Sequence, residues 1–174
     1  GQGGGAIALT VAAACRIDGI LNADGNTLSN GRGGCGSGGS VFITCGIFSG
    51  TGGTITADGP NGTNQSGGGG GGRIAIIVTD SAAQADIAKP LTVFSARGGA
   101  SANYADAKPG TLYLSNLNLI DETCYRHSGH LIIPNFSSWQ PTSLNIENAM
   151  VQFSTNAFDL AVDGDLQISG STAT

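Results

Sequence analysis

The sequence is poor in charge. Only 11% of its 174 residues are Asp, Glu, Lys or Arg, against about 25% in an average soluble domain. The net charge is -5, and the seven Lys and Arg residues are scattered singly. Neutralising phosphates requires clustered basic residues, so the composition argues against a nucleic-acid partner. A surface of Ser, Thr, Asn and Gly also adds little electrostatic repulsion between molecules, which favours association.

Aromatic residues and long apolar runs are scarce too. Aromatics make up 6% of the chain and 30 residues are glycine, so we expect a narrow core of thin Ile, Leu, Val and Ala layers. The longest apolar stretch, residues 6–15, is shorter than the roughly 18 residues of a membrane-spanning helix. No transmembrane segment is therefore expected. Neither end carries a recognisable signal peptide or capping segment, which predicts a fragment or a processed subunit.

What the sequence does contain is a repeat. Residues 5–11 align without a gap on residues 39–45, at an offset of 34. Residues 19–25 align on residues 53–59 in the same register. A third copy begins at Gly72 and is lengthened by a polar insertion, and a fourth copy begins at Gly110. Two matched blocks at one spacing are typical of a repeat architecture.

Within each copy, apolar residues alternate with small or polar ones, which is typical of a strand with one buried face. Residues one repeat apart should then stack in two ladders: Leu9, Ile43, Ile76 and Leu114 in the first, and Ala23, Ala57 and Ala96 in the second. Parallel strands need long connections, so we expect an all-β fold, a parallel β-solenoid with glycine-rich loops. The alternative, an antiparallel sandwich, requires tight hairpin turns, whereas the connections here are about a dozen residues long.

The repeat divides the chain into two parts. Residues 1–119 contain the glycine-rich repeats. Residues 120–174 contain shorter strand-like pieces and are expected to continue the solenoid with narrower coils.

Three segments carry a resemblance to known proteins. These are residues 67–76 (a glycine run followed by Arg-Ile-Ala-Ile), residues 94–99 (Phe-Ser-Ala-Arg-Gly-Gly) and residues 110–114 (Gly-Thr-Leu-Tyr-Leu). They resemble the glycine-rich repeat regions of very large bacterial secreted and cell-surface proteins. The resemblance implies a right-handed parallel β-helix, as in adhesins and autotransporter passengers, and an extracellular stalk or scaffold. It supplies no catalytic residues.

The four cysteines are candidates for disulfide bridges. Cys15 and Cys45 share the parity of the buried strand residues, whereas Cys35 and Cys124 lie in loops. Four cysteines in a secreted chain allow two bridges and three pairings, which the sequence leaves open. We expect at least one bridge, with Cys35 and a nearby core cysteine as one candidate pair.

Two groups of residues have the types that bind metals. Cys124, His127 and His130 resemble part of a Zn or Cu site, but no fourth ligand is evident, and a polar turn before the strand at Leu131 is the favoured explanation. Asp24 and Asp58 occupy the same slot in neighbouring repeats, where two carboxylates suit Ca²⁺.

The third repeat has Arg97 in that slot. This favours a salt-bridged ladder over a calcium site. We therefore expect no metal and no cofactor.

Exposed groups offer further candidate sites. Asn61, Asn64 and Asn135 begin glycosylation sequons. The rings that could stack on sugars are Trp139, Tyr104, Tyr113 and Tyr125, although a lone Trp is more often a core filler.

No feature of the sequence indicates catalysis. It contains no nucleophile elbow and no phosphate loop, and no pair of carboxylates stands out from a solvated turn. We expect a structural or adhesive protein at the cell surface or outside the cell, without enzymatic activity, that packs against copies of itself or sister domains. The alternatives are a module that binds surface glycans, or a polysaccharide lyase or glycosidase on a β-helix.

Overall fold

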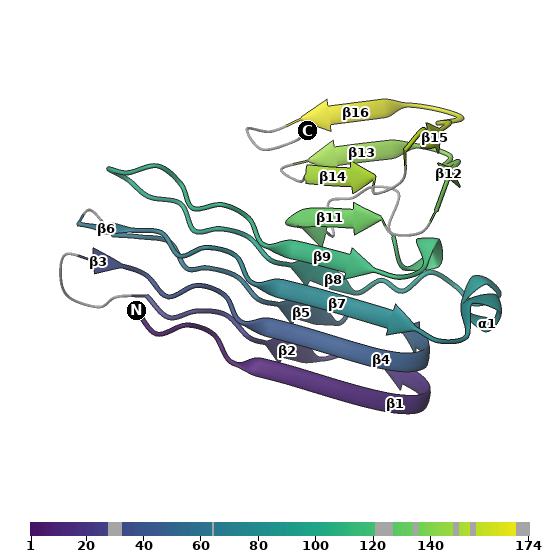
Figure 1. Ribbon diagram of the computed structural model, residues 1–174, viewed down its shortest axis with the longest axis horizontal. Helices are drawn as coiled ribbons and strands as arrows, with labels where there is room; N and C mark the ends of the chain where they lie inside the picture. The colour runs from purple at the N-terminus through teal and green to yellow at the C-terminus, as the bar shows by residue number, and fades with distance from the viewer. Residues whose placement is uncertain are drawn as a thin grey trace.

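A computed structural model describes residues 1–27, 33–63, 65–120, 127–133, 136–147, 150–153 and 156–169. A six-stranded parallel sheet forms one layer of the molecule, here called the main sheet (Figure 1). Its strands, in spatial order, are β1 (Ala6–Arg16), β4 (Ser40–Ser49), β7 (Arg73–Val78), β9 (Thr111–Leu114), β11 (His130–Ile133) and β14 (Met150–Phe153).

A second layer lies behind the main sheet in Figure 1. It contains a four-stranded parallel sheet of β2 (Ile20–Asn22), β5 (Thr54–Thr56), β8 (Val93–Ser95) and β10 (His127–Ser128). Three parallel pairs complete the described strands: β3 (Gly33–Gly34) with β6 (Ser66–Gly67), β12 (Ser138–Trp139) with β15 (Asp159–Leu160), and β13 (Leu144–Glu147) with β16 (Leu166–Ser169). Every strand pair among the described residues is parallel, so the predicted all-β, parallel class is confirmed.

The strand register follows the sequence repeat. Leu9 pairs with Ile43, Ile43 with Ile76, and Ile76 with Leu114. The second sheet pairs Asn22 with Thr56 and Thr56 with Ser95. Both predicted ladders are therefore confirmed, since the three alanines directly follow these paired residues. A bulge between Val11 and Ala14 shifts the end of β1 by one residue against β4.

The core lies between the two layers and consists of side chains from alternate strand positions. Phe48 and Phe94 are fully buried, and their ring centroids lie 6.0 Å apart across the interior. Trp139 is also buried and belongs to this core. It is a core filler, as its sequence context indicated, and it presents no exposed ring to a sugar.

The polar insertion in the third repeat forms a short helix, α1 (Ser81–Ala85), beside the end of β7. Gln84 in this helix is fully buried. Its side-chain Oε1 accepts a hydrogen bond from the backbone N–H of Phe48 at 2.7 Å, and its Nε2 donates to the carbonyl of Phe48 at 3.0 Å. One glutamine amide therefore acts as a peptide group and continues the sheet beyond the last residue of β7.

The strand-like pieces expected after residue 120 are present. β11 and β14 extend the main sheet, and β13 pairs with β16 in register from Leu144 with Leu166 to Glu147 with Ser169. None of the helices in the described residues has the length and apolar character needed to cross a membrane.

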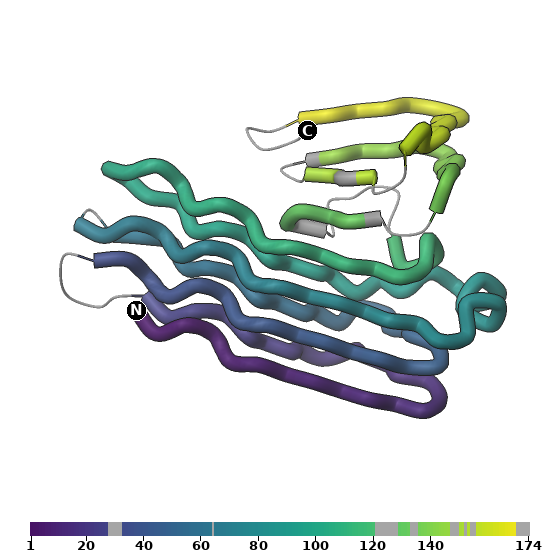
Figure 2. The backbone as a smooth tube through the Cα atoms, in the orientation of Figure 1, coloured from purple at the N-terminus to yellow at the C-terminus, as the bar shows by residue number. Residues whose placement is uncertain are grey.

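The described parts of the glycine-rich loops extend from the same end of the sheets, with the backbones of successive repeats running side by side (Figure 2). Where the loops enter the main sheet, Arg73 N–H donates to the Gly39 carbonyl at 2.9 Å and Thr111 N–H donates to the Gly72 carbonyl at 3.0 Å. A Cβ atom on Gly72 would overlap the Gly39 carbonyl oxygen. Glycine is required here because neighbouring backbones lie too close for a side chain.

This close approach predicts the effect of two alanine substitutions in one glycine run. Gly72→Ala should lower the free energy of unfolding by about 1–3 kcal/mol, because a backbone must move to admit the methyl group. Gly70→Ala should change it by less than about 0.5 kcal/mol, since a Cβ there meets no atom within 4 Å. Urea unfolding followed by circular dichroism measures both values. Equal losses from the two variants would contradict this explanation.

Candidate functional site

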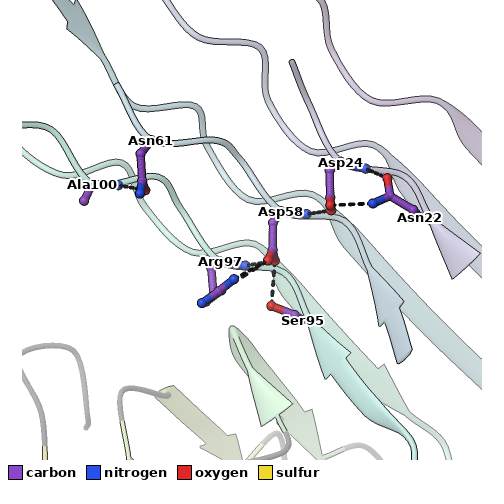
Figure 3. A network of polar contacts seen from close by, with 7 residues as sticks. All are labelled: Asn22, Asp24, Asp58, Asn61, Ser95, Arg97 and Ala100. Atoms are coloured by element: carbon purple, nitrogen blue, oxygen red, sulfur yellow. Dashed lines mark hydrogen bonds and ion pairs between the residues drawn. The ribbon is translucent and has the colours of Figure 1, made fainter. Parts of the chain in front are cut away.

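Polar side chains gather where the strands of the second sheet end. In three successive repeats, a buried alanine is followed by Asp24, Asp58 or Arg97. Adjacent residues of an extended chain face opposite ways, so these three side chains point away from the core. Together with Asn22, Ser95 and Asn61 they form the group that we call the polar ladder (Figure 3).

Asp24 links the first two repeats. Its Oδ1 accepts a hydrogen bond from the backbone N–H of Asp58 at 2.6 Å, and its Oδ2 accepts one from Nδ2 of Asn22 at 2.7 Å. The backbone N–H of Asp24 donates in turn to Oδ1 of Asn22 at 2.9 Å. Both carboxylate oxygens of Asp24 are thus occupied by donors from the protein.

Asp58 links the second repeat to the third in a similar way. Its Oδ1 accepts hydrogen bonds from the Arg97 backbone N–H and the Ser95 hydroxyl, each at 2.7 Å. Its Oδ2 accepts from Nε of Arg97 at 3.1 Å and from Nη2 at 3.0 Å. The side chain of Asp58 is 14% exposed and that of Arg97 is 67% exposed. The expected salt bridge is therefore confirmed between Asp58 and Arg97, whereas Asp24 bonds to Asn22 and to the Asp58 backbone.

The same device joins repeats at two further positions. Oδ1 of Asn61 accepts from the backbone N–H of Ala100 at 2.9 Å. Oδ1 of Asp18 accepts from the backbone N–H of Thr51 at 2.7 Å and from its hydroxyl at 3.0 Å. In each case a side-chain oxygen in one repeat accepts a backbone N–H of the next, outside the strands that would otherwise provide a partner.

The pKa of the Asp18 carboxyl lies below its ordinary value of 3.8. The main cause is the hydrogen bond from the Thr51 backbone, followed by those from the Arg16 side chain and the Thr51 hydroxyl. These donors stabilise the ionised carboxylate.

The polar ladder borders a surface groove of about 470 Å³, whose lining includes Asp24, Asp58 and Arg97. Each oxygen of the two carboxylates already accepts at least one hydrogen bond from the protein. No group of three His, Cys, Asp or Glu residues able to hold a metal ion occurs in the described part of the chain. The polar ladder joins neighbouring repeats through hydrogen bonds and an ion pair.

The other metal candidates are only partly described. Cys124 and the side chain of His127 lie outside the described residues. His130 lies on β11, and its buried Nε2 has no hydrogen-bond partner within the ranges described above.

Cys15, Cys35 and Cys45 are free thiols. The expected bridge between Cys35 and a core cysteine is not formed, because Sγ of Cys35 lies in the loop region, 3.4 Å from the Asn61 carbonyl oxygen to which it donates. Burial raises the pKa of Cys15. Burial, with a smaller contribution from the charge of Cys15, raises the pKa of Cys45 to about 11. Both core thiols therefore stay protonated and unreactive at neutral pH.

The candidate glycosylation sites and the candidate sugar-stacking tyrosines differ in their exposure. Asn61 is exposed, although its Oδ1 belongs to the polar ladder. Tyr104 is exposed and Tyr113 is half-buried. Asn64, Asn135 and Tyr125 lie outside the described residues.

Two functional roles were not anticipated from the sequence. Asn61 lies three residues after Asp58, and its partner Ala100 lies three residues after Arg97, so extending the repeat register would have identified this pair. Gln84 gave no such signal, because it lies in the insertion, which has no counterpart in the other repeats.

The polar ladder predicts that substitutions of Asp58 and of Arg97 lower the free energy of unfolding by different amounts. Asp58→Ala should lower the free energy of unfolding by about 1–3 kcal/mol, because it removes the acceptor from a backbone N–H and a hydroxyl of the next repeat. Arg97→Gln should cost less than about 1 kcal/mol, since an exposed ion pair contributes little. Asp58→Asn, which keeps one acceptor, should fall between them. Chemical unfolding of the three variants tests this order, and a larger loss from Arg97→Gln than from Asp58→Ala would contradict it.

The lowered pKa of Asp18 predicts that the stability of the protein depends on pH. Because its pKa is lowered in the folded state, its contribution to stability is present above pH 3.8 and is lost as the pH falls through the folded value. The melting temperature of wild type should therefore exceed that of Asp18→Ala by an amount that shrinks between about pH 5 and about pH 2. Asp86→Ala removes an exposed carboxylate that bonds to no described residue and serves as the control. A constant difference between wild type and Asp18→Ala over this range would show that the prediction is wrong.

Comparison with known proteins assigns no activity to the polar ladder. No family model, curated protein or solved structure matches the chain. Its function is therefore argued from its own geometry.

Proposed function

We propose that the chain is a closed, right-handed parallel β-solenoid that acts as an extracellular structural or adhesive scaffold and assembles end to end with copies of itself. The observation that carries this proposal is the apolar surface at both ends of the strand stack. The parallel register between successive repeats supports the solenoid, because each repeat contributes one strand to each of the two sheets.

At the first end, β1 is the outermost strand of the main sheet. Its core-facing residues Ile7, Leu9 and Val11 are only partly buried. Their partners on β4, the next strand, are at most 1% exposed. The edge strand is 11 residues long and has no charged residue before Arg16. A long, apolar, uncharged edge of this kind readily pairs with another strand.

At the opposite end of the molecule, β16 presents a similar layer (Figure 1). Leu166 and Ile168 are 53% and 55% exposed, although they pair with the buried residues Leu144 and Ile146. Two different apolar surfaces at opposite ends favour a head-to-tail contact, and a head-to-tail contact that does not close into a ring produces a filament. A second copy of the chain, or a sister domain, would cover either apolar surface.

The remaining polar groups also support a structural role. Asp18, Asp24 and Asp58 bind backbone groups of the neighbouring repeat. Residues used in this way stabilise the stack of repeats. The extracellular location rests on the resemblance of the repeats to secreted and surface proteins, and on a surface with few charges.

The assembly proposal predicts a change in oligomeric state. Wild type should form elongated oligomers, detected by light scattering and electron microscopy. The double variant Ala8→Lys and Ala12→Lys places two charges on exposed positions of the β1 edge and should reduce the mean particle mass at least several-fold, because charged edges resist strand pairing.

A matched control separates this effect from simple charge. Ala102→Lys and Ala105→Lys add the same two charges at exposed loop positions away from β1, and this variant should assemble as wild type does. A compact monomer for wild type at high concentration would overturn the proposal. Equal loss of assembly in both double variants would show that the edge is not the contact.

A further inference from the structure

The outward face of the main sheet carries a row of polar side chains at the start of its strands. Ser40, Arg73 and Thr111 are paired across β4, β7 and β9. The residues that follow them, Val41, Ile74 and Leu112, are buried. Because successive residues of a strand alternate between faces, the polar row points outward.

A groove of about 420 Å³ lies along this row. The three polar residues line it together with Ser37, and its floor is made by the glycines that precede the strands. The hydroxyls of Ser40 and Thr111 therefore lie on either side of the Arg73 strand, at the strand spacing of about 4.8 Å.

Arg73 is the one charged residue in β4, β7 and β9. It is exposed, and its guanidinium has no hydrogen bond or ion pair with any residue that the structure describes. This sets it apart from Arg16 and Arg97, each of which pairs with an aspartate. Along the chain the nearest acidic residue is Asp80, which lies beyond the end of β7, seven positions from Arg73 or roughly 23 Å in an extended chain. The groove thus offers an uncompensated cation in a protein of net charge -5.

Two aromatic rings lie beside the groove on the same face. Phe42, Ala75 and Tyr113 form the next outward row, two residues further along the three strands. Phe42 is 49% exposed and Tyr113 is partly exposed. The rings are two strands apart, roughly 10 Å, with only the methyl group of Ala75 between them. They provide flat apolar surfaces against which sugar rings can stack.

We propose that this face binds an acidic polysaccharide, in which a sugar carboxylate pairs with Arg73. The Ser40 and Thr111 hydroxyls bind sugar hydroxyls, and the Phe42 and Tyr113 rings contact the C–H faces of neighbouring sugars. An arginine fork binds a carboxylate through two hydrogen bonds, which fixes its orientation. A nucleic acid would need several clustered cations, which this face lacks.

The test measures binding of the full chain to immobilised polygalacturonate, with dextran as the neutral polysaccharide. At about 0.15 M salt the Debye length is about 8 Å, so charges elsewhere on the protein contribute little. Wild type should bind polygalacturonate and not dextran. Arg73→Gln should weaken binding about tenfold through loss of the charge-assisted pair. Phe42→Ala with Tyr113→Ala should weaken it by a similar factor.

Arg16→Gln is the matched control, because it removes one equally charged and exposed arginine from the main sheet outside the groove. It should leave binding unchanged. Thermal melting confirms that each variant is folded, and Arg73→Lys, which retains the charge, should restore part of the affinity. The proposal is overturned if wild type fails to bind, if dextran binds equally well, or if Arg16→Gln weakens binding as much as Arg73→Gln.

Discussion

The structure depends on backbone hydrogen bonding between successive repeats. Each parallel strand must find its N–H and C=O partners in the repeat before and the repeat after it, and a buried backbone group without a partner is costly. The requirement extends beyond the strands: in the loops, the Gly59 N–H donates to the Arg97 carbonyl and the Gly99 N–H donates to the Gly69 carbonyl. The abundance of glycine follows, because backbones that approach this closely leave no space for side chains.

Beyond the ends of the strands, side chains provide the hydrogen-bond partners that neighbouring backbones no longer provide. Asp24 and Asp58 accept backbone N–H groups of the next repeat beyond the end of the second sheet. Gln84 supplies both a donor and an acceptor to Phe48 where β7 has already ended. These polar residues therefore have a structural role. A polar residue without a structural partner, such as Arg73, is correspondingly informative about binding.

The repeat register is predictable from the sequence because it is a local signal copied along the chain. The offset of 34 places Leu9 on Ile43, and the slot shared by Asp58 and Arg97 indicates their salt bridge from the repeat alone. Features outside the repeat are not predictable in this way. The prediction of a bridge at Cys35 was wrong because the sequence places this residue in a loop but does not reveal that its thiol lies against Asn61 and Ser66 of the next repeat. The groove at Arg73 depends on three strands meeting side by side, which the sequence shows only after their register is known.

The geometry separates the two proposed activities in space. End-to-end assembly uses the first and last layers of the stack, at β1 and β16, and leaves the outward face of the main sheet uncovered. Each added copy would then contribute one further Arg73 groove to the surface of the assembly. A polysaccharide repeats its carboxylates along one chain, so several grooves could bind the same molecule, and the second contact would benefit from a high effective concentration. A single arginine with two hydroxyls is a weak site by itself. Assembly is the step that would make such a weak site useful to a surface scaffold.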